Sequence, residues 1–548
     1  MQRHRAARAR RGLAGLTAIA LLATLSGSTA AAPGGQGKAG FRTSIQAMLK
    51  PGANAPAGTM IDPLVTVGDA IDDGFVFDSI PDGISLIRHG QGTVELFVNH
   101  ETSLVPFPIV TNPDLSVTRF DDFTNSHVDR LVVNQFSAGV VDAGDAIPSG
   151  ANYQRFCSNF LAGPEQGFDR RILFTNEEAT DLVYRTGIAW PVNEPADPRV
   201  PEQAGVVVAL DVESGEFKSI YGMGRHNHEN SVAIPGYDDL VVLSGDDTFS
   251  APASQLYSYV ANDTDAVWND TGTLYAFKSA DPLTNDYGDL AAGETVAGSF
   301  IPVPEAIAKG DQTGLENWGN LPENNVFQFI RVEDIAYDRN HPNVVYFADT
   351  GEPRASTATS AGAGRLTRAG STFQGPFPNG RIFKMVLNED NPLVVDELSV
   401  LIDADVGGYG NPAVLHQPDN IETTANSLLI QEDPGSHNQF ALSDPAGVGA
   451  RVWRYDLDSG VLQAVIEVDQ SLDETAGYDV DGGAAARKGA WESSGIIDAS
   501  SIWGAGWFLI DVQAGSLILE STAGTLGGIS VQFEREGGQL LRVKIPGS

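Results

Sequence analysis

Five short polar motifs place acidic, amide or histidine side chains next to segments that read as β-strands. Carboxylates from different strands can meet around one centre, where they would bind hard cations such as Ca²⁺ through about six to eight oxygen ligands. Gathered acids repel one another unless a cation neutralises them, so either metals bind here or the motifs stay apart. The motifs are Asn99-His100-Glu101, Thr175-Asn176-Glu177-Glu178, Gly224-Arg225-His226-Asn227-His228-Glu229, Arg331-Val332-Glu333-Asp334-Ile335 and Pro418-Asp419-Asn420-Ile421.

Arg331 stands two residues before Glu333 in a strand-like stretch, so both side chains should lie on the same side of that strand. A guanidinium beside a metal cluster is a usual contact for phosphate. We therefore predict Arg331 as a catalytic and substrate-binding residue, although a structural ion pair with Glu333 gives the same pattern. His228 and His100 are candidates for proton transfer or, equally, for support of metal ligands.

Each motif has a plainer interpretation when it is taken alone. A single glutamate after a strand is usually a solvated loop residue, and Asp419-Asn420 is an ordinary turn pair. Asp246-Asp247 reads as a surface turn. Cys157, the single cysteine of the chain, reads as a small buried apolar residue rather than a nucleophile.

The segments that must position these residues are short and rich in β-branched and aromatic residues, with Gly, Asp, Asn and Pro turns between them. Two near-identical turns, 211–215 and 456–460, follow two similar strands. Repeated strand–turn–strand units indicate blades of a β-propeller, and about 80 residues per elaborated blade gives about six blades. We predict an all-β propeller with long loop insertions, whose first and last strands close one blade together. A pair of β-sandwich domains is the rival fold.

Composition and charge narrow the function classes. The chain has 548 residues, 71 acidic against 34 basic groups and a net charge of -37. Nucleic-acid binding needs clustered Lys and Arg to contact phosphates, so this charge argues against it and favours cations as partners. The sequence contains no stretch of about 20 apolar residues, so we predict no transmembrane segment.

The N-terminus reads as an export signal. Five arginines within residues 3–11 precede an apolar run over 13–25 and a small-residue stretch to Ala32, which together are typical of a secretory signal peptide. The pair Arg10-Arg11 fits the twin-arginine translocase, and the Sec translocase is the alternative. We predict a signal peptide over 1–32, a flexible mature N-terminus over 33–45 and a single propeller domain over 46–548, secreted to the periplasm or the extracellular space.

The motifs, in their order along the chain, resemble those of the PhoX-type alkaline phosphatases (the DUF839 family). The resemblance spans roughly residues 81–513, and no single motif is decisive. It is carried by Pro81-Asp82-Gly83, Leu96-Phe97-Val98-Asn99-His100-Glu101, Asn176-Glu177-Glu178, Gly224-Arg225 with His228-Glu229, Arg331 with Glu333-Asp334-Ile335, Val345-Tyr346-Phe347-Ala348-Asp349-Thr350, Gly380-Arg381-Ile382 and Pro418-Asp419-Asn420.

This resemblance implies a secreted β-propeller that hydrolyses small phosphate monoesters with calcium, more than one ion, and with iron in some members. It implies that Arg331 contacts the substrate phosphate and that Asn420 lies in the substrate site. It also implies the metal site. The residues expected to be metal ligands or to lie beside the metals are Glu229, Glu333, Asp419, Glu177, Glu178, Asn176 and Glu101.

The chain departs from the family pattern in places that bear on the metals. Asn176 stands where the family often has a cysteine that bridges two irons, and Cys157 lies upstream and is not expected to replace it. The run 162–169 and the stretch from Gln513 to Gly515 also differ from the family's motifs. Calcium is therefore the expected metal, with iron as the open question. Two other functions remain: a calcium-stabilised propeller that binds a partner, with little or no catalysis, and a propeller lactonase.

Overall fold

In the computed structural model, the described residues are 39–548 without 73, 91, 106–108, 112–116, 184, 186–200, 249–253, 353–376, 435–438, 474–478, 481–486 and 527–528. The predicted signal peptide, 1–32, lies outside them. Within the described part the fold is all-β and is a propeller of six blades, which confirms the predicted fold class. All six blades belong to one unit, Ala39–Ser548.

The first three blades are antiparallel sheets of four strands each, ordered from the centre outwards along the chain. Blade 1 holds β5 (Pro81–His89), β6 (Thr93–His100), β9 (His127–Asn134) and β10 (Val140–Ile147). Blade 2 holds β11 (Phe156–Ala162), β12 (Ile172–Glu177), β15 (Val207–Asp211) and β16 (Phe217–Ile220). Blade 3 holds β17 (His228–Ile234), β18 (Leu240–Asp246), β19 (Tyr257–Ala261) and β20 (Thr273–Ser279).

The other three blades repeat the same plan with additions. Blade 4 holds β22 (Val332–Tyr337), β23 (Val344–Asp349), β24 (Arg381–Asn388) and β25 (Asn391–Asp403), and β21 (Thr295–Pro302) joins it to blade 3. Blade 5 holds β26 (Pro418–Thr423), β27 (Ser427–Glu432), β29 (Arg451–Asp456) and β30 (Leu462–Val468), with β1 (Leu49–Pro51) outside. Blade 6 holds β32 (Glu492–Asp498), β33 (Trp507–Leu526), β34 (Ile529–Lys544) and β2 (Met60–Thr66).

Smaller elements decorate this frame. The short strand pairs are β3 (Ala70–Asp72) with β4 (Phe75–Val76), β13 (Leu182–Val183) with β14 (Glu202–Gln203), and β28 (Phe440–Ala441) with β31 (Arg487–Lys488), while β7 (Ile109–Thr111) and β8 (Val117–Asp121) extend the edge of β34. The α-helices are α1 (Thr264–Trp268), α2 (Glu305–Ala308), α3 (Gln312–Gly319) and α4 (Ser500–Trp503). No helix of the described residues is long and apolar enough to cross a membrane.

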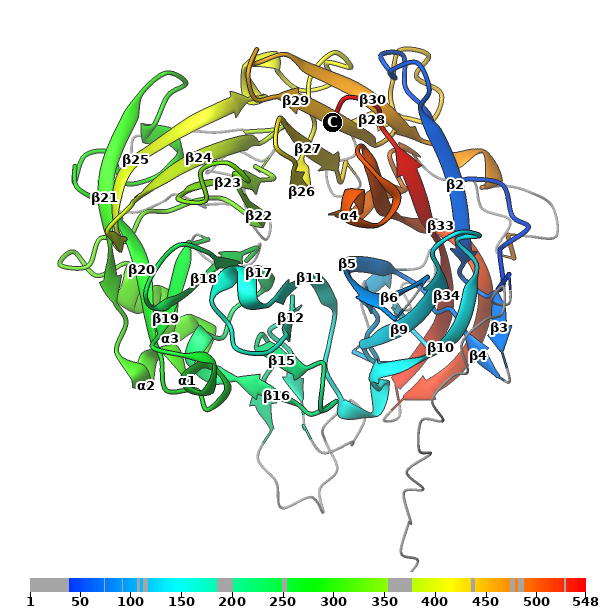
Figure 1. Cartoon of the computed structure of the whole chain (residues 1–548), viewed down its shortest axis with the longest axis horizontal. Coiled ribbons are helices and arrows are strands. Elements are labelled where there is room, and N and C mark those ends of the chain that lie inside the picture. Colours follow the sequence, from blue (N-terminus) through cyan, green and yellow to red (C-terminus); the bar gives the residue numbers. More distant parts are fainter. Residues whose placement is uncertain are drawn as a thin grey trace, which may run out of the picture. The chain divides into compact units, whose positions relative to one another are not determined.

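The six innermost strands surround one axis, and five of them are labelled around the centre of Figure 1. Each innermost strand contacts the next, in the order β5, β11, β17, β22, β26, β32 and back to β5. The ring is closed because β2, from the N-terminal part, pairs antiparallel with β34 near the C-terminus, from Met60 opposite Lys544 to Thr66 opposite Gln539. The last strand, β34, thus closes its blade with a strand from the N-terminal part, as predicted, but that strand is β2, because the first strand, β1, pairs with β30 of blade 5.

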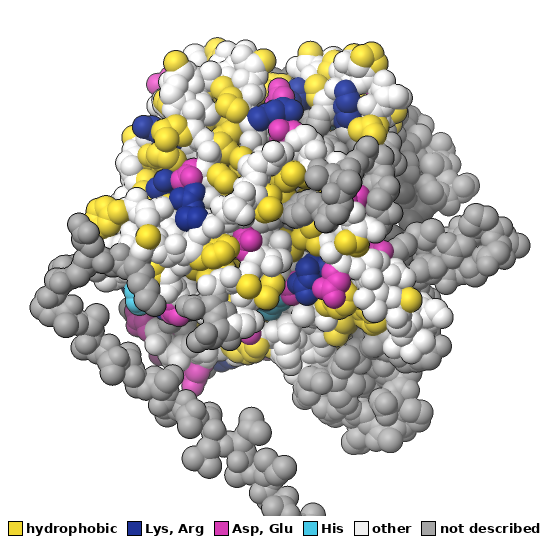
Figure 2. All heavy atoms as spheres, turned by 90° about the vertical axis from the view of Figure 1, so that its right-hand side faces the viewer, with side chains coloured by type: hydrophobic (Ala, Val, Ile, Leu, Met, Phe, Trp, Pro, Cys, Tyr) yellow, Lys and Arg dark blue, Asp and Glu magenta, His cyan; other side chains and the backbone are white. Residues whose placement is uncertain are grey.

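Apolar side chains fill every interface between neighbouring blades. One buried cluster lies at each of the six interfaces; for example, Val232 and Leu243 of blade 3 pack with Phe347 and Phe383 of blade 4. Such alternating β-branched and aromatic residues favour strands packed face to face. Figure 2 shows acidic and basic side chains lying beside one another on one outer face, with apolar ones scattered between them.

The two predicted hairpin turns occur where the sequence placed them. The Asp211 carboxylate accepts hydrogen bonds from the backbone N–H groups of Glu213 and Ser214, at 3.0 Å each, and Gly215 has φ 74°. Asp456 and Gly460, with φ 70°, repeat this arrangement between β29 and β30. At the N-terminus, Phe41 exchanges backbone hydrogen bonds of 2.7 and 2.9 Å with Val140. The predicted flexible stretch 33–45 is therefore anchored to blade 1 from Phe41 onwards.

Candidate metal centre

A β-bulge recurs at the same place in five of the six innermost strands. In each of these innermost strands, the second and third residues together lie opposite a single residue of the neighbouring strand. A bulge leaves one residue outside the ladder and re-aims its side chain. The first residue of each bulged pair is a potential metal ligand: Asp82, Cys157, Glu229, Glu333 and Asp419.

These residues form a chain of overlapping groups. In each group the three ligand atoms lie within 4.8 Å of one another, and neighbouring groups share Cys157, Glu229 or Asp419. The arrangement therefore offers four adjacent positions for cations around the axis. The groups are Asp82, Glu101 and Cys157; Cys157, Glu178 and Glu229; Glu229, Glu333 and Asp419; and Asp419, Asp433 and Glu492.

Burial raises the pKa of five acids in this cluster. It raises the pKa of Asp82 to about 6 and that of Glu101 to about 8, where the charge of Asp82 adds to the effect. The pKa values of Glu229, Glu333 and Asp419 are raised well above their usual range, first by burial and then by neighbouring acids. Without cations, such groups must take up protons to remain buried together.

The donor atoms fit metal ions. One carboxylate oxygen of Asp82 and one of Asp419 are buried and accept no hydrogen bond. Buried oxygens without a donor are costly, and a cation removes that cost. Carboxylates suit hard cations such as Ca²⁺, whereas the Sγ of Cys157 is a ligand that softer transition metals prefer.

Arg331 lies at one edge of the cluster. Its Nε and Nη2 each donate to one carboxylate oxygen of Asp247 at 2.5 Å, and Nη2 is 3.4 Å from Oε1 of Glu333. Burial alone would lower the pKa of Arg331, but Asp247 and Glu333 hold it well above its usual value, so the charge is kept. The structure thus brings Arg331 and Glu333 together. Asp247 is 1% exposed rather than part of a surface turn.

Of the predicted ligands, Glu101, Glu178, Glu229, Glu333 and Asp419 join these groups. Glu177 does not. Its two oxygens accept hydrogen bonds from Arg185 at 2.6 Å each and from the backbone N–H groups of Gln154, Gly205 and Val206. Asn176 does not join them either: its amide donates to the Ser158 carbonyl and accepts from the Ser231 hydroxyl. Both side chains stabilise blade contacts.

We predict that Glu177→Gln destabilises the fold and leaves the metal content unchanged. Removing one charge from the buried pair with Arg185 should lower the free energy of unfolding by about 3 kcal/mol. Urea unfolding of the metal-free protein measures the first effect, and elemental analysis of the purified variant measures the second. Loss of bound metal in this variant would instead place Glu177 among the ligands.

The two histidines predicted for proton transfer are engaged elsewhere. His100 bonds the Ser79 carbonyl through Nδ1 and Asp129 through Nε2, both at 2.9 Å, and its ring stacks on His127. His228 bonds the Ser244 hydroxyl through Nδ1 and the Gly224 carbonyl through Nε2. Burial lowers the pKa of His228 to about 3, so the ring stays neutral. Among the described residues, His228 belongs to none of the groups, and His100 belongs to a separate group with His127 and Asp129 that shares no residue with the other four.

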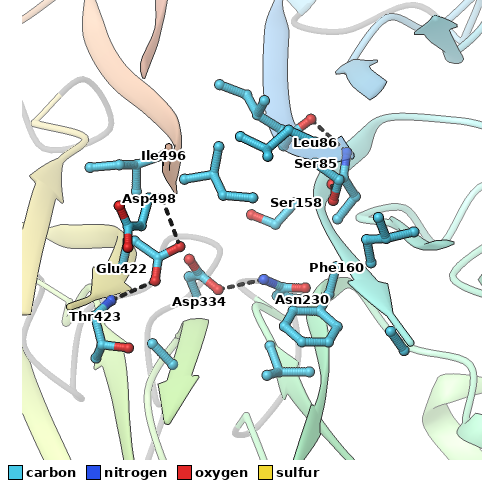
Figure 3. Close-up of a pocket in the computed structure, with 18 of the residues that line it drawn as sticks. Ser85, Leu86, Ser158, Phe160, Asn230, Asp334, Glu422, Thr423, Ile496 and Asp498 are labelled. Atoms are coloured by element: carbon cyan, nitrogen blue, oxygen red, sulfur yellow. Dashed lines mark hydrogen bonds between the residues drawn. The ribbon is translucent and has the colours of Figure 1, made fainter. Parts of the chain in front are cut away.

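Asn420, predicted to contact substrate, lies one layer below the acids. Its Nδ2 donates to the Ser158 hydroxyl at 2.8 Å, and its Oδ1 accepts from the Gly495 backbone at 3.2 Å. Its side chain therefore links blade 5 to blades 2 and 6. A cavity of about 610 Å³ lies beyond this layer. Figure 3 shows Ser158 among the residues that line it, with Asn230 bonded to Asp334.

The sequence interpretation missed several members of the cluster. Cys157 is buried, as predicted, and its Sγ also belongs to two of the groups, which the sequence did not indicate. Asp433 and Glu492 were not predicted, and Asp82 was quoted only as part of a motif. Asp82, Cys157 and Asp419 each stand second in an innermost strand, as Glu229 and Glu333 do. Aligning the strand starts would have shown the shared position.

Comparisons with known proteins show the family and the fold. The sequence profile of the family described as alkaline phosphatase PhoX matches residues 174–455, just over half of the chain. A structure of Pseudomonas fluorescens PhoX in complex with vanadate, a transition-state analogue, matches with a TM-score of 0.55 and 15% identity, covering 91% of this chain and 98% of that chain. At this identity the structural match shows the fold alone.

A second solved structure, Penicillium chrysogenum α-L-arabinanase complexed with arabinobiose, matches with a TM-score of 0.36 and 9% identity, covering 88% of this chain and 98% of that chain. So low a TM-score carries no argument about this chain. A search of curated protein sequences found no match.

Proposed function

The chain belongs to the PhoX alkaline phosphatase family, and from that premise we propose that it is an exported, calcium-dependent phosphomonoesterase. One observation supports this most directly: the arginine that could bind a phosphate, Arg331, lies 3.4 Å from Glu333, a member of the acidic cluster. An always cationic side chain next to a site for cations favours an anion bound between them.

We propose that the metals lie in the four overlapping groups. The positions made of carboxylates alone, around Glu229, Glu333 and Asp419 and around Asp433 and Glu492, suit Ca²⁺. The positions that include Cys157 suit iron, because thiolate ligands favour transition metals over calcium. When bound, such ions supply positive charge to the phosphate oxygens and activate the attacking oxygen as Lewis acids.

The chain's own residues bind and orient the substrate. Asp247 holds the guanidinium plane of Arg331 by its two-pronged contact, so the arginine does not have to be ordered when the phosphate arrives. In that orientation Arg331 can stabilise negative charge on the equatorial oxygens of the transferring phosphoryl group. The buried acids exclude bulk water from the site, which strengthens these interactions.

Export is part of the proposal. The support is the N-terminal pattern of arginines followed by an apolar run and small residues, which is typical of a signal peptide. Either the twin-arginine or the Sec translocase would carry the chain to the periplasm or the extracellular space. We propose that the mature protein works there on small phosphorylated substrates.

Hydrolysis of p-nitrophenyl phosphate by the purified mature protein tests the function. We expect turnover that falls at least about a hundredfold after treatment with a chelator and returns when Ca²⁺ is added, because the metals hold the phosphate oxygens. Elemental analysis before and after treatment should show calcium, and iron if Cys157 binds it. Bis-p-nitrophenyl phosphate, a diester, is the matched control substrate and should be hydrolysed more slowly.

Two results would contradict the proposal. Calcium that raises the thermal unfolding temperature of a protein without phosphatase activity would favour the calcium-stabilised binding propeller. Turnover that survives complete removal of metals would remove the role of the acidic cluster.

A further inference from the structure

The second residue of each bulged pair forms a layer directly below the acids. Because both residues of a bulge lie opposite one residue of the next strand, each of the five bulged strands contributes one residue to the metal cluster and the following residue to this layer. All members of the layer line the cavity on its other side. The layer consists of Gly83, Ser158, Asn230, Asp334 and Asn420.

Ser158 and Asn420 link this layer to the metal cluster. The Ser158 hydroxyl donates to Oε1 of Glu229 at 2.8 Å. The Asn420 amide in turn donates to the Ser158 oxygen at 2.8 Å. The hydroxyl therefore has one donor and one acceptor bond, both at good length, and its direction is fixed. All three residues are at most 2% exposed.

The same hydrogen-bonded chain continues to the other side of the axis. Oδ1 of Asn420 accepts from the Ser494 hydroxyl at 3.4 Å. Ser494 lies 3.4 Å from Nε2 of Gln513, and this amide donates its two hydrogens to Asp82 at 3.0 Å and Glu101 at 3.1 Å. A line of polar contacts thus runs from the glutamate shared by two metal groups to two acids of a third group.

We propose that Ser158 and Asn420 are positioning residues that hold the carboxylate of Glu229 in the orientation needed to bind metal. A carboxylate has about four acceptor sites. Ser158 occupies one of them on Oε1, which fixes the rotation of the group and directs the remaining sites to the cations. Partners of this kind typically change metal affinity by 10- to 100-fold when they are removed. The inference rests on the metal binding proposed above, but it does not require phosphatase activity.

The test is calcium affinity, measured by titration of the chelator-treated full-length mature protein. Ser158→Ala removes the donor to Glu229, and Asn420→Leu keeps the volume but removes the donor to Ser158. Each should weaken calcium binding by about 10- to 100-fold. Because both act through one chain, the double variant should be about as weak as the weaker single variant, without multiplication of the two effects.

Thr423→Val is the matched control. Thr423 lies on β26 like Asn420, is buried and lines the same cavity, but its hydroxyl donates to the Tyr337 carbonyl rather than toward the acids. This variant should keep the calcium affinity of the wild type. The rise in unfolding temperature on adding calcium is a second readout, and it should shrink in the Ser158 and Asn420 variants only.

Several outcomes would overturn the inference. Wild-type calcium affinity in Ser158→Ala would mean that Glu229 needs no positioning donor. Effects that multiply in the double variant would mean that the two residues do not act through one chain. An equal lowering of the unfolding temperature with and without calcium would mean that they only stabilise the fold. If Asn420→Leu does not fold, Ser158→Ala and the nearly isosteric Ser158→Cys decide the question. A protein that binds calcium in this way but does not hydrolyse phosphate esters would contradict the proposed function alone.

Discussion

Glu229→Gln is expected to lower phosphatase activity about a thousandfold and to remove bound metal from the cluster. Glu229 is shared by two of the four groups, so the loss of its charge weakens two neighbouring positions at once. Glutamine has the same shape and can still accept the hydrogen bond from Ser158, so packing is kept. A thousandfold loss corresponds to about 4 kcal/mol of transition-state stabilisation, within the range that a metal supplies.

The measurement combines kcat/KM for p-nitrophenyl phosphate with elemental analysis of the purified variant. Glu177→Gln is the matched control, because it makes the same chemical change in a buried glutamate that pairs with Arg185 instead of joining the cluster. The control should keep its metals and its activity. Full activity in Glu229→Gln would exclude the acidic cluster as the catalytic centre.

Arg331→Lys is expected to lower activity at least about tenfold, or ~1.4 kcal/mol of transition-state stabilisation. Lysine keeps the charge but has no planar fork, so it can bind neither Asp247 nor a phosphate through two parallel hydrogen bonds. Arg331→Ala removes the charge as well and should be more severe. Calcium should still raise the unfolding temperature of both variants, because Arg331 cannot be a metal ligand.

Asp247→Asn tests whether the orientation of Arg331 matters separately from its charge. It keeps the shape of the partner but weakens the contact with Arg331, so we expect a smaller loss than in Arg331→Lys. Unchanged turnover in both Arg331 variants would make the arginine a structural partner of Asp247 and Glu333. The calcium-stabilised binding propeller would then be the better hypothesis.

The repeated fold could be predicted because its evidence is local. Turns such as 211–215 and 456–460 depend on an aspartate that caps its own backbone and a glycine at positive φ, and both are visible in the sequence. The number of blades followed from length. That Glu229, Glu333 and Asp419 would meet also followed, because each stands at the start of a strand in a different repeat.

Which of two adjacent glutamates joins the acidic cluster was harder to predict. Glu177 ends β12 and Glu178 follows it, and side chains of successive residues in extended chain point to opposite sides. One therefore meets Arg185 and the other joins Cys157 and Glu229. Which of the two faces the axis depends on the packing of the blade, and the sequence pattern alone does not show it.

The place of Cys157 in the cluster was missed for a related reason. An isolated cysteine in a strand is usually buried among apolar side chains, and the sequence near it lacks the family's motif. Once the strand starts are known, Cys157 is seen to occupy the same place in β11 as Glu229 in β17 and Glu333 in β22, at the first position of a bulge. A bulge arises from the pairing of two strands, so it is invisible until the register is known.

The recurring bulge also separates two properties that are usually coupled in a protein: what the chain folds into and what it binds. A bulged residue lies outside the ladder, and its apolar neighbours carry the blade contacts. The hydrogen bonds of the ladder therefore do not dictate whether aspartate, glutamate or cysteine stands at such a place. Mutation could retune the metal selectivity of this propeller one blade at a time, for instance by changing Cys157 to aspartate, so the same scaffold could acquire new chemistry through single substitutions.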